Sequence, residues 1–129
     1  MKFVHPTFFF ILLISELCFA QWYWQNPLPQ GNKLMSVQFV NSDLGWAVGE
    51  GGTVLKTTDG GNSWSVKHCS PYSTYNNAVY FIDENVGWVA ASGGRIFKTL
   101  DGGTSWIEKS TPIYSNLNSI IFKDLNYGI

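Results

Sequence analysis

The amino-acid sequence predicts an all-β protein built from repeated four-stranded units, and three observations carry this prediction. Residues 34–64 return 42 positions later as residues 76–106, and 13 of the 31 aligned residues are identical. Each copy contains four short apolar runs separated by turn-forming residues, and no segment after residue 20 has the spacing of an apolar helix face over ten positions. A period near 40 residues with about four strands per unit is typical of a β-propeller, in which each four-stranded antiparallel sheet is one blade.

The four predicted strands occupy matching places in the two full units. They cover residues 35–40, 45–49, 53–57 and 64–67 in the first unit, and 77–82, 87–91, 95–99 and 106–109 in the second. Val37 and Phe39 fall on one face of the first strand, because side chains alternate with a period of two. A glycine pair, Gly51-Gly52 or Gly93-Gly94, follows the second strand and predicts a tight hairpin, because glycine adopts positive φ without steric strain.

Parts of further blades are expected at both ends. We place blade 1 at about residues 34–69, blade 2 at about 76–111 and a partial blade 3 from about residue 117. Trp22 lies 15 residues before Val37, just as Trp64 precedes Val79, so the segment from Trp22 to about Pro27 is predicted to be an N-terminal closing strand. Propellers have about four to eight blades. We therefore expect an incomplete ring, the N-terminal part of a longer protein whose other blades are missing, with a ring of several copies as the alternative.

The first 20 residues have the pattern of a secretory signal peptide. Lys2 precedes an apolar run at residues 8–14, and small residues stand three and one positions before the expected cleavage after Ala20. A lipoprotein acylated at Cys18 is the alternative. We expect an exported protein, periplasmic, at the cell surface or extracellular, whose residues 21–129 do not insert into the membrane, because no later apolar run is long enough to span it.

The composition after residue 20 excludes several kinds of site and partner. Seven basic and eight acidic side chains remain there, whereas binding of nucleic acid requires a basic surface. Cys69 is the only cysteine in this part, so no internal disulfide can form. His68 is its only histidine, which argues against a metal site or a catalytic triad. We expect no cofactor, no metal and no nucleic-acid partner.

A motif of Thr, Asp, Gly, Ser and Trp at fixed spacing follows the third strand of each unit. Its members are Thr57, Asp59, Gly61, Ser63 and Trp64 in the first unit, and Thr99, Asp101, Gly103, Ser105 and Trp106 in the second. An Asp that opens a tight turn can accept hydrogen bonds from N–H groups of the loop, and the Trp ring can cover the turn. Catalytic carboxylates converge on one bond and calcium takes about six to eight oxygens, which isolated turns do not supply. We interpret the motif as structural and expect no catalytic residue.

This motif resembles the Asp-box, also called the bacterial neuraminidase repeat or BNR. Together with residues 45–49 and the run from Gly51 to Trp64, it is similar to the photosystem II stability/assembly factor-like propellers, including their exported bacterial members. The resemblance implies a seven-bladed propeller. It also implies, for photosynthetic members, an assembly chaperone that binds reaction-centre proteins through an arginine-rich surface. Arg95 is the only arginine in this sequence.

Two functions remain open from the sequence. The first is a binding or scaffold protein, not an enzyme, that recognises a protein or a cell-surface component through its loops. The loop at residues 70–76 is the preferred surface for this, and the aromatic residues near strand connections are Trp24, Tyr72, Tyr75 and Tyr114. The second is the N-terminal part of a secreted glycan-active enzyme whose catalytic carboxylates lie partly beyond residue 129. Sialidases also carry Asp-boxes, but their three-arginine cluster cannot be formed from one arginine.

Overall fold

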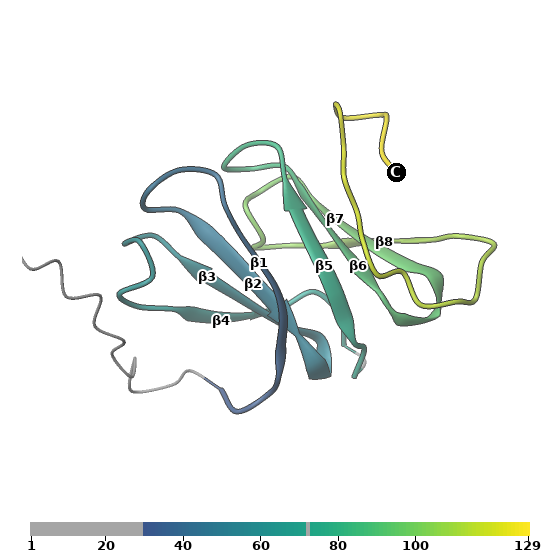
Figure 1. Ribbon diagram of the computed structural model, residues 1–129, viewed down its shortest axis with the longest axis horizontal. Helices are drawn as coiled ribbons and strands as arrows, with labels where there is room; N and C mark the ends of the chain where they lie inside the picture. Colours follow the sequence, from purple (N-terminus) through teal and green to yellow (C-terminus); the bar gives the residue numbers. More distant parts are fainter. Residues whose placement is uncertain (1–29, 72) are drawn as a thin grey trace, which may run out of the picture.

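The computed structural model of the chain describes residues 30–71 and 73–129 (Figure 1). These residues form two four-stranded antiparallel sheets, each a meander in which neighbouring strands are consecutive in the chain. The first sheet holds β1 (Leu34–Phe39), β2 (Gly45–Gly49), β3 (Thr53–Thr57) and β4 (Ser65–His68). The second holds β5 (Asn76–Phe81), β6 (Gly87–Ala91), β7 (Arg95–Thr99) and β8 (Ile107–Ser110). The predicted all-β class and the four-stranded antiparallel blades are confirmed.

The second and third strands of each unit have the predicted bounds, whereas the first and fourth are displaced by one residue. The first strand ends one residue early because the Val40 amide donates to Leu44 O across the turn, 3.0 Å away. The fourth begins one residue late because Ser65, not Trp64, pairs with Lys56. Ile82 repeats the behaviour of Val40. The local turn therefore decides where each strand begins or ends, and apolar alternation does not reveal it.

Two short 3₁₀ segments, η1 (Glu50–Gly52) and η2 (Ser92–Gly94), join the second and third strands. Gly51 and Gly52 have φ of 68° and 71°, and Gly93 and Gly94 both have 72°. The predicted glycine hairpins are thus present with positive φ at both positions. Both turns lie at one end of the molecule, which we call the Gly-Gly end. The segment that links the two sheets also passes through this end.

The main core lies between the two sheets. Trp46 on β2 stacks on Phe81 on β5 with ring centroids 3.6 Å apart and planes 6° apart. The strands β1 and β5 lie side by side and run in the same direction, since Ser36 lies beside Val79 and Gln38 beside Phe81 (Figure 1). The buried members of this cluster are Trp46, Val48, Val54, Cys69, Val79, Phe81, Val89, Ala91 and Phe97.

Residues 117–129 pack on the other face of the second sheet. Ile120 is buried there with Ala78 and Trp88, and Phe122 stacks on Trp88 with ring centroids 3.8 Å apart. The segment forms a hairpin in which Ile121 and Ile129 exchange two backbone hydrogen bonds of 2.8 Å, with one isolated bridge in place of a named strand. Phe122 therefore repeats the contact that Phe81 makes with the preceding unit.

The predicted signal peptide (residues 1–20) and the predicted closing strand (Trp22 to Pro27) lie outside the described residues. In the part of the chain that the structure describes, no helix is both long enough and apolar enough to cross a membrane.

Candidate functional site

Each Asp-box forms a closed hydrogen-bond network within its own turn. The Thr57 hydroxyl donates to Asp59 Oδ1 at 2.8 Å and accepts the Gly61 amide at 2.9 Å. The same carboxylate accepts the Ser63 amide at 2.8 Å and the Ser63 hydroxyl at 2.5 Å. The second box repeats these bonds with the same partners, namely Thr99, Asp101, Gly103 and Ser105. The motif residues singled out in the sequence are thus brought together, but within two separate turns.

These hydrogen bonds act on the pKa of each carboxyl. The hydroxyl of Ser105, followed by its backbone amide, lowers the pKa of Asp101 to about 2. The corresponding bonds from Ser63 lower the pKa of Asp59. A general acid works with a raised pKa, so a carboxylate held ionised in this way is poorly suited to donate a proton.

The glycine and Trp positions complete the turn. Gly60 and Gly61 have φ of 68° and 89°, which a residue with a side chain rarely adopts. The Trp64 ring covers Gly61, and in the second box the Trp106 indole donates to Gly103 O at 3.2 Å. The expected roles of glycine and Trp in the turn agree with this geometry.

The Asp-box turn also makes the contact between the two sheets. Gly102 O, in the second box, accepts the Trp46 indole N–H at 3.1 Å and the Lys56 ammonium at 3.0 Å, both from the first sheet. Lys56 Nζ also lies 5.4 Å from the centroid of the Trp46 ring. We call these three residues the inter-blade clamp. In the sequence, the sign of it is that all three residues recur in the repeat: Lys56 as Lys98, Trp46 as Trp88, and Gly102 as Gly60.

The second copy of this Lys has a different acceptor. Lys98 Nζ lies 5.2 Å from the Trp88 ring centroid, as in the first unit, but donates to Leu125 O at a distance of 3.5 Å. The Lys–Trp pair of the first unit therefore forms a tight clamp between the two sheets. The Lys–Trp pair of the second unit makes a looser contact with the hairpin of residues 117–129.

The turns after the first strands are stabilised by a side chain that accepts two amides. Asp83 Oδ1 accepts the amides of Asn85 and Val86, at 2.8 and 2.7 Å. In the first unit the same place is taken by Asn41, which accepts the amides of Asp43 and Leu44. Asp83 is therefore the counterpart of Asn41 in the repeat. All these groups serve turns at the end that carries the Asp-boxes, which we call the Asp-box end.

Among residues 30–71 and 73–129, no three His, Cys, Asp or Glu side chains lie close enough together to hold a metal ion. The buried Cys69 thiol accepts a hydrogen bond from Asn76 Nδ2 at 3.3 Å, and burial raises its pKa to about 11. A thiol with that pKa is protonated and weakly nucleophilic at neutral pH.

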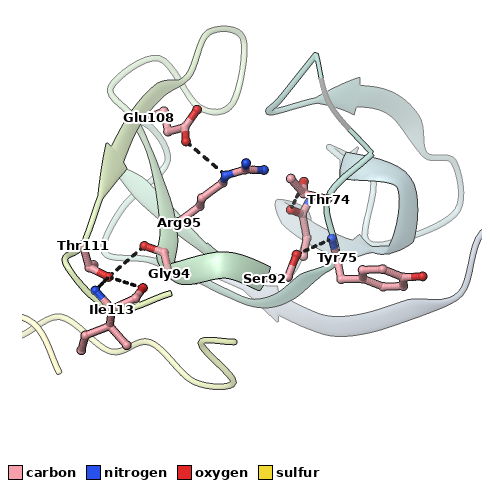
Figure 2. A network of polar contacts seen from close by, with 9 residues as sticks. Thr74, Tyr75, Ser92, Gly94, Arg95, Glu108, Thr111 and Ile113 are labelled. Carbon is pink, nitrogen blue, oxygen red and sulfur yellow. Dashed lines mark hydrogen bonds and ion pairs between the residues drawn. The ribbon is translucent and has the colours of Figure 1, made fainter. Parts of the chain in front are cut away.

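The described residues of the preferred loop, 70–71 and 73–76, lie at the Gly-Gly end and contact both sheets. Gly52 of η1 donates to Thr74 O at 2.8 Å, and Ser92 of η2 donates to Tyr75 O at 2.9 Å. Tyr75 N donates back to the Ser92 hydroxyl at 3.2 Å, and Figure 2 shows the Tyr75 ring pointing away from this contact. Arg95, the first residue of β7, forms an ion pair with Glu108 on β8, with 3.4 Å between Nε and Oε1 (Figure 2).

The structure describes one of the other three aromatic candidates. Tyr114, in the segment after β8, is almost fully exposed. Trp24 and Tyr72 lie outside the described residues. The described part of the chain thus offers Tyr75 as an aromatic side chain on an anchored backbone. The backbone is anchored by contacts between the two blades, which the sequence does not display.

Comparison with known proteins gives one consistent result. The family profile described as "Photosynthesis system II assembly factor YCF48" matches residues 15–108. A solved structure described as "YCF48 bound to D1 peptide" superposes with a TM-score of 0.64 at 27% sequence identity, covering 72% of this chain and 32% of that chain. YCF48 from Cyanidioschyzon merolae has a TM-score of 0.65 at 19% identity, covering 77% and 34%, and this likeness concerns the fold alone. A search of curated proteins found no match.

This chain therefore spans only 32% and 34% of the length of those two solved proteins. The matched proteins are assembly factors with a propeller fold, and one of them is bound to a peptide. The profile match covers most of the sequence and agrees with the blades and Asp-boxes described above. The chain belongs to the family of the photosystem II assembly factor YCF48, whose members are BNR-type β-propellers.

Proposed function

We propose that this protein is an exported scaffold that binds a segment of a partner protein, at the cell surface or in the periplasm. The observation that carries the proposal is the likeness, at 27% identity and a TM-score of 0.64, to a YCF48 structure bound to a D1 peptide. Export is supported by the signal-peptide pattern of residues 1–20. Besides the partner protein, the remaining blades of the propeller are expected to bind to the two sheets.

The chemistry of the described residues supports binding over catalysis. Asp59 and Asp101 are ionised and engaged in their own turns, and the Cys69 thiol is buried and protonated. The proposal therefore takes the Asp-boxes as structural and looks for recognition in the loops. A glycan-active enzyme with catalytic carboxylates beyond residue 129 is the competing function.

Selection from a displayed library of random linear 12-residue peptides tests the proposal. The whole chain after residue 20 is immobilised, and enriched peptides are synthesised with a fluorescein label for anisotropy titration. We expect a consensus that binds with a dissociation constant of roughly 1–100 μM, which is typical of modest protein–peptide contacts. Absence of any enriched consensus, or hydrolysis of a glucan or sialoside by the same preparation, would overturn the proposal.

A further inference from the structure

The inner strands of the two sheets are joined by side chains that take the place of a partner strand. The side-chain amide of Gln38 on β1 donates to Phe81 O at 3.0 Å, and its Oε1 accepts the Phe81 N–H. Two positions earlier on β1, the Ser36 hydroxyl accepts the Val79 N–H at 3.4 Å. The bonded groups lie at the edge of β5 that does not pair with β6. We call the side chains of Ser36 and Gln38 the inner latch.

The next joint along the chain, between β5 and residues 117–129, has no inner latch. One unit later the place of Gln38 is taken by Tyr80, and that of Ser36 by Ala78, whose methyl group forms no hydrogen bond. The N–H and C=O of Phe122 form no hydrogen bond with any other described residue. Both sides of this joint are described, so the latch is missing because of the residue types and not because of an absent blade.

Residues 117–129, which we call the strap, are tied to the second sheet mainly at the Gly-Gly end. The Leu117 N–H donates to Ala91 O at 3.3 Å, and Asn77 Nδ2 donates to Leu117 O at 2.9 Å. Beyond Leu117, among the described residues, the sheet makes one hydrogen bond to the strap, from Lys98 Nζ to Leu125 O at 3.5 Å. Leu117 is therefore the fixed point, and apolar packing holds the rest of the strap.

This packing hides an aromatic surface of the second sheet. Ile120 and Phe122 cover Trp88 and Ala90, which are 3% and 0% exposed. The strap has hydrogen bonds of its own, such as those between Ile121 and Ile129. An isolated two-stranded hairpin is only marginally stable in water. When the strap leaves the sheet, its internal bonds are therefore lost as well.

We propose that the strap opens as a unit about Leu117 while the two latched sheets stay joined. The joint between β5 and the strap is a hinge, and the surface around Trp88 is accessible only in the open form. Elements that open in proteins are drawn from their least stable parts, and hinges consist of a few residues at the ends of elements. This hinge does not depend on the proposed function, because it follows from the inner latch and its absence one unit later.

Native-state hydrogen exchange on the whole chain after residue 20, followed at single amides by NMR, tests the hinge. Ile82 and Lys123 form a matched pair, because each donates across the same turn of its own unit, to Val86 O at 3.1 Å and to Tyr127 O at 2.8 Å. We expect the Lys123 amide to exchange at least about tenfold faster than the Ile82 amide. Low concentrations of urea accelerate exchange at Ile82, which requires the sheets to unfold, but not at Lys123.

Two variants change the latch at one joint each. Gln38→Met removes the latch amide and speeds exchange at Ile82 by about tenfold or more, because two hydrogen bonds are lost, but leaves Lys123 within about twofold. Tyr80→Gln places the same amide in the second unit and slows exchange at Lys123 by about fivefold. Tyr80→Ala is its control, because it removes the ring without adding an amide and does not slow this exchange.

Two results would overturn the hinge. Equal exchange at Ile82 and Lys123 in the wild type, or an equal change at both amides in Gln38→Met, shows that all three units open together. A folded Tyr80→Gln chain with wild-type exchange at Lys123 shows that the latch does not control the joint. If Tyr80→Gln does not fold, Gln38→Met decides the question by itself.

Discussion

The inter-blade clamp predicts that Lys56 stabilises the protein far more than its repeat counterpart Lys98. Replacing Lys56 by Met keeps most of the apolar stem and removes the ammonium that donates to Gly102 O at 3.0 Å and lies over the Trp46 ring. Lys98→Met is the matched control, because its ammonium lies over Trp88 at a similar distance but is 3.5 Å from its acceptor.

The magnitude follows from the contacts that each substitution removes. A hydrogen bond from a charged donor contributes about 1.5–3 kcal/mol to the free energy of unfolding, and a cation–π contact at an exposed site about 0.5–1 kcal/mol. Lys56 is half-buried, and Gly102 O keeps the Trp46 indole as a donor, so values at the low end apply. We expect a loss of about 2 kcal/mol for Lys56→Met and of about 0.5–1 kcal/mol for Lys98→Met.

Urea unfolding at pH 7, followed by Trp fluorescence, measures both losses, and an unchanged slope shows that the folded state has kept its compactness. A domain of this size loses about 4–8 °C in melting temperature per kcal/mol, so heat unfolding gives a second measurement. Equal losses for the two variants, or a loss below about 0.5 kcal/mol for Lys56→Met, would refute the assignment of the clamp.

Three further predictions concern single groups. Because the folded pKa of Asp101 (about 2) lies below its ordinary 3.8, its ionised form adds stability that is full above about pH 4 and is lost as the pH falls toward 2; Asp101→Asn flattens this part of a melting-temperature profile, and a profile parallel to the wild type contradicts it. Gly87→Ala places a Cβ 2.4 Å from the Phe81 ring and lowers the free energy of unfolding by about 1–3 kcal/mol in urea, whereas Gly31→Ala, with open space around it, changes it little. The Cys69 thiol, buried and with its pKa near 11, reacts with a thiol-specific disulfide reagent only in denaturant, and rapid reaction in buffer would show that the site opens.

Much of the fold could be predicted because each strand carries its own local signals. The hairpins at η1 and η2 follow from glycine pairs, and β2, β3, β6 and β7 have the predicted bounds because turn residues enclose them on both sides. The observed bounds of the first and fourth strands differ from the predicted ones by one residue. The ends of these strands depend on hydrogen bonds such as that of Val40 to Leu44, which a hydrophobic pattern does not reveal.

The candidate site was predicted less completely, since its decisive contacts join residues far apart in sequence. The Asp-box bonds connect residues two to four positions apart, and the sequence motif already contains both partners. The clamp joins Lys56 to Gly102 across the sheet boundary, and the exposure of Tyr75 depends on both glycine turns. No pattern within one unit specifies how two units face each other.

Phe39, Phe81 and Phe122 occupy the same place in successive units. They show that the arrangement of the units decides how much each of these residues stabilises the chain. Phe81 and Phe122 each stack on the Trp of the unit before them. Phe39, at the same place in the repeat, makes the edge contact with Trp64 of its own unit that Phe81 also makes with Trp106, but no ring of another unit stacks on it among the described residues. Phe39 is 42% exposed and Phe81 2% exposed. Since hydrophobic stabilisation grows with the apolar area removed from water, about 25 cal/mol per Å², identical residues in the repeat stabilise the chain unequally. Phe39 lacks the stacked Trp that Phe81 and Phe122 have, so among the described residues the outer face of the first sheet is the one that remains uncovered, whereas the second sheet is covered on both faces.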